Sequence, residues 1–116
     1  MTNLNMEYEL LIRRAYQTNA HTIEYGSQSA YDTLLSLESK VKTHPGDEDL
    51  FEEYQEQLNN IKVTIDIALD HMMSRANDEN VLNELTNHKI DINLAKNADK
   101  ISAVIPLAKK IGDNLN

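Results

Sequence analysis

A heptad pattern in the middle of the chain constrains the fold more than any other feature. Apolar residues recur there at alternating steps of three and four, which places them on one side of an α-helix. This spacing is typical of the a and d positions of coiled-coil-like packing. We therefore expect a long helix over residues 47–76 with one side facing another helix. The seam consists of Phe51, Tyr54, Leu58, Ile61, Ile65, Ala68 and Met72.

The segment before this helix is also amphipathic. Apolar residues recur at helical spacing from Leu4 to Val41, which predicts one helix over residues 4–42 with a weak point near Gly26, where it can bend. Pro45 and Gly46 then stop the helix and permit a sharp reversal of the chain. Asp47 or Asp49 can cap the helix that follows. The two long helices are therefore expected to form an antiparallel hairpin.

Two shorter helices are expected after the hairpin. The first covers residues 78–88 and ends at a break between Asn87 and Asp91. The second covers residues 92–112, is kinked at Pro106 and ends near Gly112. Residues 1–116 then form one all-α domain, an antiparallel helical hairpin with coiled-coil-like helices plus shorter C-terminal helices packing as a bundle. The seam is closed either within one chain or between two chains of a homodimer. The apolar side of the last helix includes Leu94, Ile101, Val104, Ala108, Ile111 and Leu115.

Composition and charge limit the function. The 116 residues include no cysteine, which excludes disulfides, thiol nucleophiles and thiolate metal ligands. The net charge of −8 argues against direct nucleic-acid binding, which depends on Lys and Arg side chains that neutralise phosphates. The amino terminus does not resemble a secretory signal, and no apolar run has the length of a membrane span. We expect a soluble protein of the cytoplasm.

The acidic residues are concentrated at the start of the seam helix. The first of them lie near a helix amino terminus, where negative charge is favoured. With Phe51 at heptad position a, the later ones fall at positions b, c and f and point away from the seam. The predicted acidic outer face consists of Glu52, Glu53, Glu56, Asp66 and Asp70.

Part of this acidic stretch resembles an enzyme family. Glu52, Glu53 and Glu56 form an EExxE string similar to that of all-α nucleotide pyrophosphohydrolases of the MazG and dimeric dUTPase type. The resemblance implies magnesium-dependent nucleotide hydrolysis, but the second acidic pair, expected on a separate helix, is not evident. The histidines also lack the spacing of metal ligands. We therefore expect no catalytic residues, no metal and no cofactor, with the hydrolase as an alternative.

Val63 and Ile67 interrupt the acidic outer face, and two interpretations are open. In one, the last helix of the same chain covers them. In the other, they form an apolar patch, rimmed by acid, that binds a partner. The lysines near the last helix are expected to dock on the acidic hairpin of the same chain rather than on a membrane. These lysines are Lys89, Lys96, Lys100, Lys109 and Lys110.

Taken together, these features predict a protein-binding module without enzymatic activity, such as a small acidic adaptor, chaperone or inhibitor. Its partner is expected to present a basic or amphipathic segment. Besides the hydrolase, a second alternative is an inhibitor that mimics DNA through its row of carboxylates. The expected partner-binding residues are Glu52, Glu53, Glu56, Val63, Asp66, Ile67 and Asp70.

Overall fold

A computed structural model describes residues 30–115 of the chain. Within this range the protein consists of four α-helices and no strand, which confirms the expected all-α bundle. The helix expected over residues 4–42 is seen only in its last part, because residues 4–29 lie outside the described range. The helices are α2 (Ala30–Thr43), α3 (Glu48–Arg75), α4 (Glu79–Leu94) and α5 (Ala98–Leu115).

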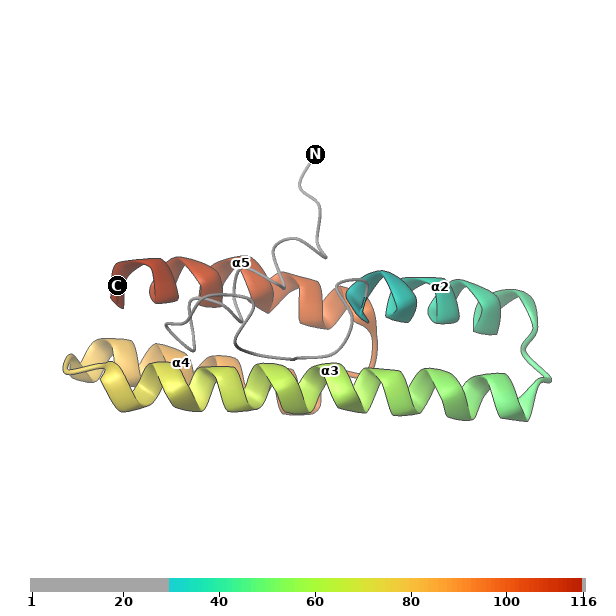
Figure 1. Cartoon of the computed structure of the whole chain (residues 1–116), viewed down its shortest axis with the longest axis horizontal. Coiled ribbons are helices and arrows are strands. Elements are labelled where there is room, and N and C mark those ends of the chain that lie inside the picture. The colour runs from blue at the N-terminus through green and yellow to red at the C-terminus, as the bar shows by residue number, and fades with distance from the viewer. Residues whose placement is uncertain (1–29, 116) are drawn as a thin grey trace.

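The long helix α3 is the element against which all the others pack (Figure 1). Helix α2 folds back over the first half of α3, so the expected hairpin is present. Helix α4 returns along the second half of α3, and α5 lies over the same half, end to end with α2. Within the described residues, the two helices α2 and α3 therefore pack together along the first half of α3, and three helices form a bundle along its second half.

Helix α3 begins with one of the capping residues that the sequence predicts, and most of its seam is buried. The Asp47 carboxylate caps the helix by accepting a hydrogen bond from the Leu50 amide at 3.0 Å. Six of the seven seam residues are buried within this single chain, from Tyr54 to Met72. Phe51 is the exception, with 50% of its surface exposed. The seam is therefore largely closed by the other helices of the same chain.

The C-terminal helices differ from the expected boundaries. No break occurs between Asn87 and Asp91, because α4 contains neither Gly nor Pro and continues to Leu94. Leu94 belongs to α4 and is exposed, so it does not lie on the buried side of the last helix. Helix α5 begins at Ala98, after Asn97 accepts a hydrogen bond from the Lys100 amide at 3.0 Å.

Pro106 and Gly112 both lie inside α5, which continues to Leu115. The expected helix end at Gly112 is therefore wrong. Gly112 is buried within the last turns of the helix. Pro106 is exposed, so its ring points to solvent rather than into the core.

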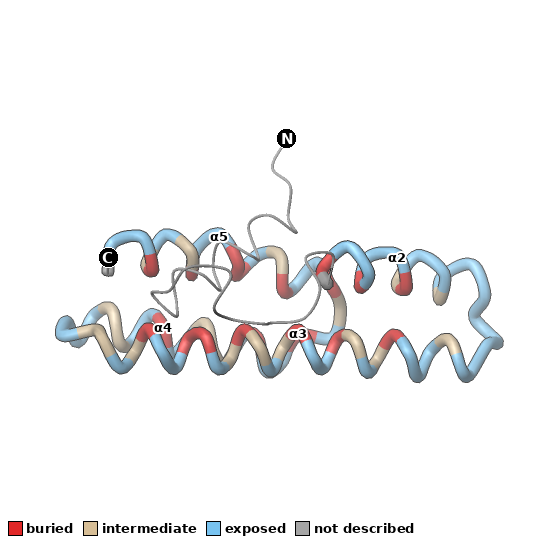
Figure 2. The backbone as a smooth tube through the Cα atoms, in the orientation of Figure 1, coloured by how far each residue is buried: buried red, intermediate tan, exposed pale blue. Residues whose placement is uncertain are grey.

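One apolar core runs along the molecule between α3 and the helices above and beside it (Figure 2). Tyr31 and Leu34 of α2, Leu85 and Ile92 of α4, and Ile101 of α5 are fully buried in it. The last helix therefore docks on its own chain, as expected, but it does so through apolar side chains. None of the described helices combines the length and apolar character needed to cross a membrane.

Candidate functional site

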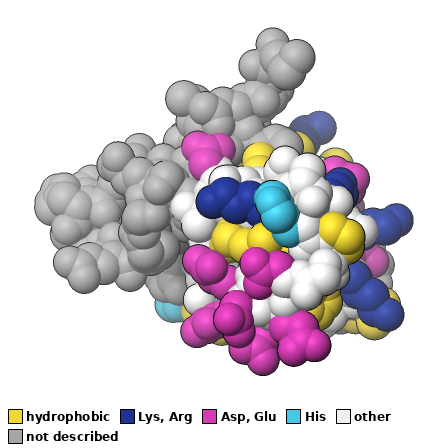
Figure 3. Space-filling view, turned by 90° about the vertical axis from the view of Figure 1, so that its right-hand side faces the viewer, with side chains coloured by type: hydrophobic (Ala, Val, Ile, Leu, Met, Phe, Trp, Pro, Cys, Tyr) yellow, Lys and Arg dark blue, Asp and Glu magenta, His cyan; other side chains and the backbone are white. Residues whose placement is uncertain are grey.

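The acidic residues at the start of α3 are open to solvent. Glu52, Glu53 and Glu56 are all exposed. Among the described residues, none of the three forms an ion pair. Figure 3 views this end of the molecule and shows acidic side chains gathered in its lower part, over the α3 side of the hairpin. These three carboxylates therefore form an exposed acidic cluster near the start of α3.

Asp66 and Asp70, further along α3, have partners within the chain. Lys89 of α4 lies between them, forming an ion pair with Asp70 and lying 3.9 Å from the Asp66 carboxylate. The hydrogen bond to Asp70 raises the pKa of Lys89. Asp66 also accepts a hydrogen bond from the Asn93 side-chain amide at 3.0 Å. These two aspartates tie α3 to α4, so they contribute less negative potential to the surface than the three glutamates do.

The contacts between α3 and α4 show how the two helices face each other. Lys62 of α3 donates hydrogen bonds to the backbone carbonyls of Asn93 and Ala95, at 3.0 and 2.8 Å. Higher residue numbers on α3 thus meet lower numbers on α4, as in any antiparallel pair. We call Lys62, Asp66, Asp70, Lys89 and Asn93 the polar row.

Val63 and Ile67 each follow a member of the polar row by one residue. One residue turns a side chain by about 100° around the helix. Ile61 and Ile65, which lie two residues earlier, are buried in the core. Two residues correspond to a rotation of about 200°, so the side chains of Val63 and Ile67 lie on the outer side of α3. Val63 is 57% exposed and Ile67 is 42% exposed. Helix α5 does not cover them, so the first of the two interpretations is wrong.

The same pattern occurs on α4, and sequence reasoning missed it. Ile92 is buried, Asn93 belongs to the polar row, and Leu94 is 71% exposed. Ile90, which follows Lys89, is 51% exposed. The sequence contains this signal as two aliphatic residues four positions apart, but the expected boundaries place Ile90 in a helix break and Leu94 in the last helix.

The four exposed aliphatic residues lie on one side of the molecule. Each of these residues directly follows a member of the polar row, which rotates its side chain by about 100° around the helix. Because α3 and α4 run antiparallel, this rotation points both pairs toward the same outer face of the α3–α4 pair. The contacts of Asp66 with Lys89 and Asn93 also place the two pairs at about the same level. We call Val63, Ile67, Ile90 and Leu94 the outer patch.

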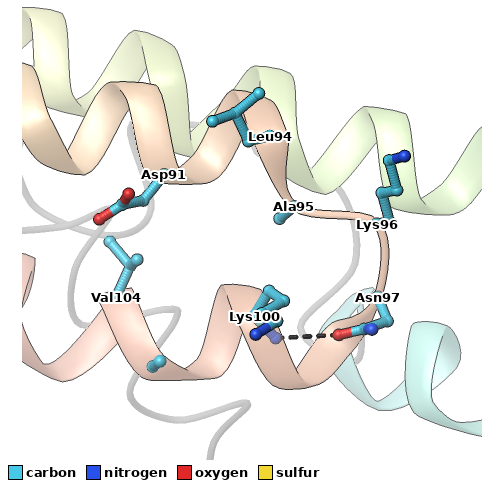
Figure 4. A pocket seen from close by; sticks show the side chains of 8 residues that line it. Asp91, Leu94, Ala95, Lys96, Asn97, Lys100 and Val104 are labelled. Carbon is cyan, nitrogen blue, oxygen red and sulfur yellow. Dashed lines mark hydrogen bonds between the residues drawn. The ribbon is translucent and has the colours of Figure 1, made fainter.

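Two hollows flank Leu94. One has a volume of about 380 Å³ and lies in the groove between α3 and α4, beside the outer patch. The other, of about 510 Å³, lies between the end of α4 and the start of α5. In Figure 4, Asp91 of α4 and Val104 of α5 face each other across this second hollow. The groove is lined by Met73, Thr86, Lys89, Ile90, Asn93 and Leu94.

Histidines and carboxylates do not converge elsewhere in residues 30–115. No three side chains of His, Asp or Glu in this range lie close enough to hold a metal ion. His44 lies in the loop before α3, His71 is exposed on α3, and His88 is half-buried on α4. His21 falls outside the described residues.

A buried polar cluster lies where α2 and α5 meet end to end. The Glu38 carboxylate accepts hydrogen bonds from the Tyr54 hydroxyl and from the Ala98 amide. The Tyr31 hydroxyl donates to the Ala98 carbonyl oxygen at 2.9 Å. Burial raises the pKa of Tyr31 to about 12, and burial together with the bond to Glu38 raises the pKa of Tyr54. These groups are satisfied by one another and serve to join the helices.

Comparison with protein-family models, with curated proteins and with solved structures yields no match for this chain.

Proposed function

We propose that this protein is a non-enzymatic binding module of the cytoplasm that holds another protein on the outer face of α3. The observation that carries the proposal is the combination, on one helix, of two exposed aliphatic residues with three exposed glutamates that form no ion pair with any described residue. Exposed apolar residues beside charge are typical of interaction sites. The seam is largely closed within the chain, which favours the outer face over the seam as the binding surface.

The charge of this face specifies the partner's chemistry. These exposed carboxylates belong to a chain with a net charge of −8, so a basic or amphipathic segment is the complementary ligand. Charge attraction raises the association rate, and apolar contact at Val63 and Ile67 supplies affinity. The protein then acts as an adaptor, chaperone or inhibitor that shields this segment.

The test is a comparison of two triple variants in capture experiments from a lysate of the protein's own cells. The first variant carries Glu52→Lys, Glu53→Lys and Glu56→Lys. The matched control reverses three exposed acids of α4 and α5 through Glu79→Lys, Glu84→Lys and Asp99→Lys. A protein that binds the wild type and the control but not the first variant is then purified, and its affinity is measured by calorimetry. Equal capture by all three chains would exclude this face as the binding site.

The enzymatic alternative is tested separately with magnesium. A ligand that binds only the folded state raises the melting temperature. We expect no increase in Tm with added Mg²⁺ and no hydrolysis of nucleoside triphosphates by the purified protein. Mg²⁺-dependent hydrolysis that is lost in the Glu52, Glu53 and Glu56 variant would replace the binding proposal with the hydrolase.

A further inference from the structure

We propose that residues 4–25 pack as a helix in the groove between α4 and α5 of the same chain. This segment precedes the described residues, and its sequence has the pattern of an amphipathic helix. The proposal concerns a different surface from the binding face on α3 and does not depend on it. The apolar stripe of the segment consists of Leu4, Tyr8, Leu11, Ile12, Ala15, Tyr16, Ala20 and Ile23.

The hollow between the end of α4 and the start of α5 has an apolar wall that no described helix covers. Its volume is about 510 Å³. Leu94 of α4 is 71% exposed, and Ala103 of α5 is also exposed. Val104 completes the wall on the α5 side (Figure 4). A groove of this kind between two helices is a surface on which the apolar stripe of a further helix can pack.

The chain enters the described fold close to this hollow. The Tyr31 hydroxyl donates a hydrogen bond to the Ala98 carbonyl oxygen, and the residue before Ala98, Asn97, lines the hollow. The segment that precedes Ala30 is therefore tethered near the groove. A short tether gives an effective concentration in the millimolar range, so the segment occupies the groove even if the contact itself is weak.

The position of α5 determines the direction of the segment. Helices α2 and α5 lie end to end, so a straight helix over residues 4–42 would collide with α5 (Figure 1). The chain has to turn before it reaches Ala30, and Gly26 permits such a turn. A helical stripe from Leu4 to Ile23 is about 29 Å long, and α5, with 18 residues, is about 27 Å long. A helix that runs from the turn along α5 therefore matches the groove in length.

The charges at the start of the groove are complementary to those of the segment. Lys96 and Lys100 line the hollow, are exposed and form no ion pair with any described residue. Glu24 is the last charged residue before Ala30, so it is the carboxylate of the segment that lies nearest to these lysines along the chain. Attraction between these opposite charges favours the orientation in which the segment starts beside the hollow.

Spin labelling of the full chain tests the proposal. The chain contains no cysteine, so a single introduced cysteine is labelled at one known position. A nitroxide on Ala103→Cys, at the hollow, is compared with one on Val63→Cys, on the outer face of α3, since both native side chains are exposed. We expect the label at position 103 to broaden the amide NMR signals of residues 8–23 more strongly than the label at position 63. Equal broadening, the reverse order, or no broadening by either label would overturn the proposal.

Variants of the segment test whether its apolar stripe makes the contact. Leu11→Asp with Ile12→Asp should abolish the broadening by the label at position 103. In the same background, the unlabelled thiol of Ala103→Cys should react with Ellman's reagent at least about tenfold faster, which corresponds to about 1.4 kcal/mol. The control places two aspartates on the polar side of the segment, through Gln17→Asp and His21→Asp, and should change neither result. Identical behaviour of the two double variants would show that the stripe is not the contact.

A mixing experiment distinguishes a contact within one chain from a contact between two chains. Isotope-enriched chain without a nitroxide is mixed with unenriched chain that carries the label at position 103. We expect no broadening in this mixture. Broadening would assign the groove to a second copy of the chain and overturn the proposal, while the binding face on α3 would be unaffected.

Discussion

The Tyr54 hydroxyl donates a hydrogen bond of 2.9 Å to the Glu38 carboxylate, which joins α3 to α2 at the point where α5 begins. The same carboxylate oxygen accepts a bond of 3.0 Å from the Ala98 amide, the first residue of α5. The Glu38 side chain is only 14% exposed. One carboxylate therefore connects three helices.

Replacing Tyr54 by Phe tests the strength of this connection. The substitution removes one donor from a largely buried carboxylate while keeping the apolar ring. Hydrogen bonds to charged groups contribute about 1.5–3 kcal/mol, so we expect a loss of roughly this size in the free energy of unfolding. Urea denaturation measures it. In a chain that already carries Glu38→Gln, the same substitution should cost less, and equal costs in the two backgrounds would show that the bond contributes nothing.

Alkaline pH should destabilise the protein through its buried tyrosines. Burial raises the pKa of Tyr31 from 10.0 to about 12, and the pKa of Tyr54 is also raised. Between these pH values the unfolded chain loses the proton and the folded chain keeps it, so stability is full below pH 10 and falls as the pH rises toward 12. Denaturation at several pH values measures the slope. Tyr31→Phe together with Tyr54→Phe should flatten it, and an unchanged slope would assign the effect to other groups.

The sequence predicted the helical elements more successfully than their ends. Heptad spacing found the buried side of α3 from Tyr54 to Met72, because burial along a helix follows a period that is visible in one dimension. The turn at Pro45 and Gly46 and the cap at Asp47 were found for a similar reason, since both depend on local chemistry. The predicted end of α4 at residue 88 was wrong, because the Asn and Asp residues near position 90 are typical of loops. In the structure this segment is helical and is in contact with α3.

The candidate site was predictable only in its α3 half. Val63 and Ile67 could be placed on the outer face from the seam alone. Ile90 and Leu94 could not be added to them, because that step requires knowing that α4 runs antiparallel to α3 and at which level. Likewise, the pairing of Asp66 and Asp70 with Lys89 depends on contacts between residues 19 or more positions apart, which no local pattern encodes.

Two isoleucines that lie two positions apart on α3 should respond very differently to truncation. Ile65 is fully buried, whereas Ile67 is 42% exposed. Ile65→Ala is expected to lower the free energy of unfolding by about 2–5 kcal/mol, because it leaves a cavity in the core. Ile67→Ala should change it by about 0.5 kcal/mol or less, as is usual for surface sites. Thermal or urea denaturation compares them, and similar losses would place Ile67 in the core.

Lys89→Met should weaken the contact between α3 and α4 in a manner that depends on salt. The ammonium group pairs with Asp66 and Asp70, and its side chain is 26% exposed. Partly exposed ion pairs contribute about 0.2–1 kcal/mol, so a loss in this range is expected at low ionic strength. Denaturation at 50 mM and at 1 M NaCl measures it, because salt screens the pair. An equal loss at both salt concentrations would attribute the effect to packing of the lysine stem instead.

Pro106→Ala is expected to stabilise the protein. Pro106 lies inside α5, where it lacks the amide needed for the helical hydrogen bond, and it is exposed. Proline in a helix interior is less favourable than alanine by up to about 3 kcal/mol, so Tm should rise. Calorimetry measures the change, with Leu107→Ala as a control at the neighbouring exposed position. A lower Tm would mean that the ring itself supports the burial of Ile105 and Ala108.

The end-to-end placement of α2 and α5 determines how the fold fixes the position of its helices along one another. Apolar helix faces can slide past one another by one turn, about 5.4 Å, and still bury aliphatic side chains. The bonds from Tyr54 and Ala98 to Glu38, and from Tyr31 to Ala98, can form in only one such position. A shift of α5 by one turn would break the two bonds made by Ala98, and each buried group left without a partner would cost about 1–3 kcal/mol. These two hydrogen bonds thus select a single alignment of α5 from the several that the apolar core alone would accept.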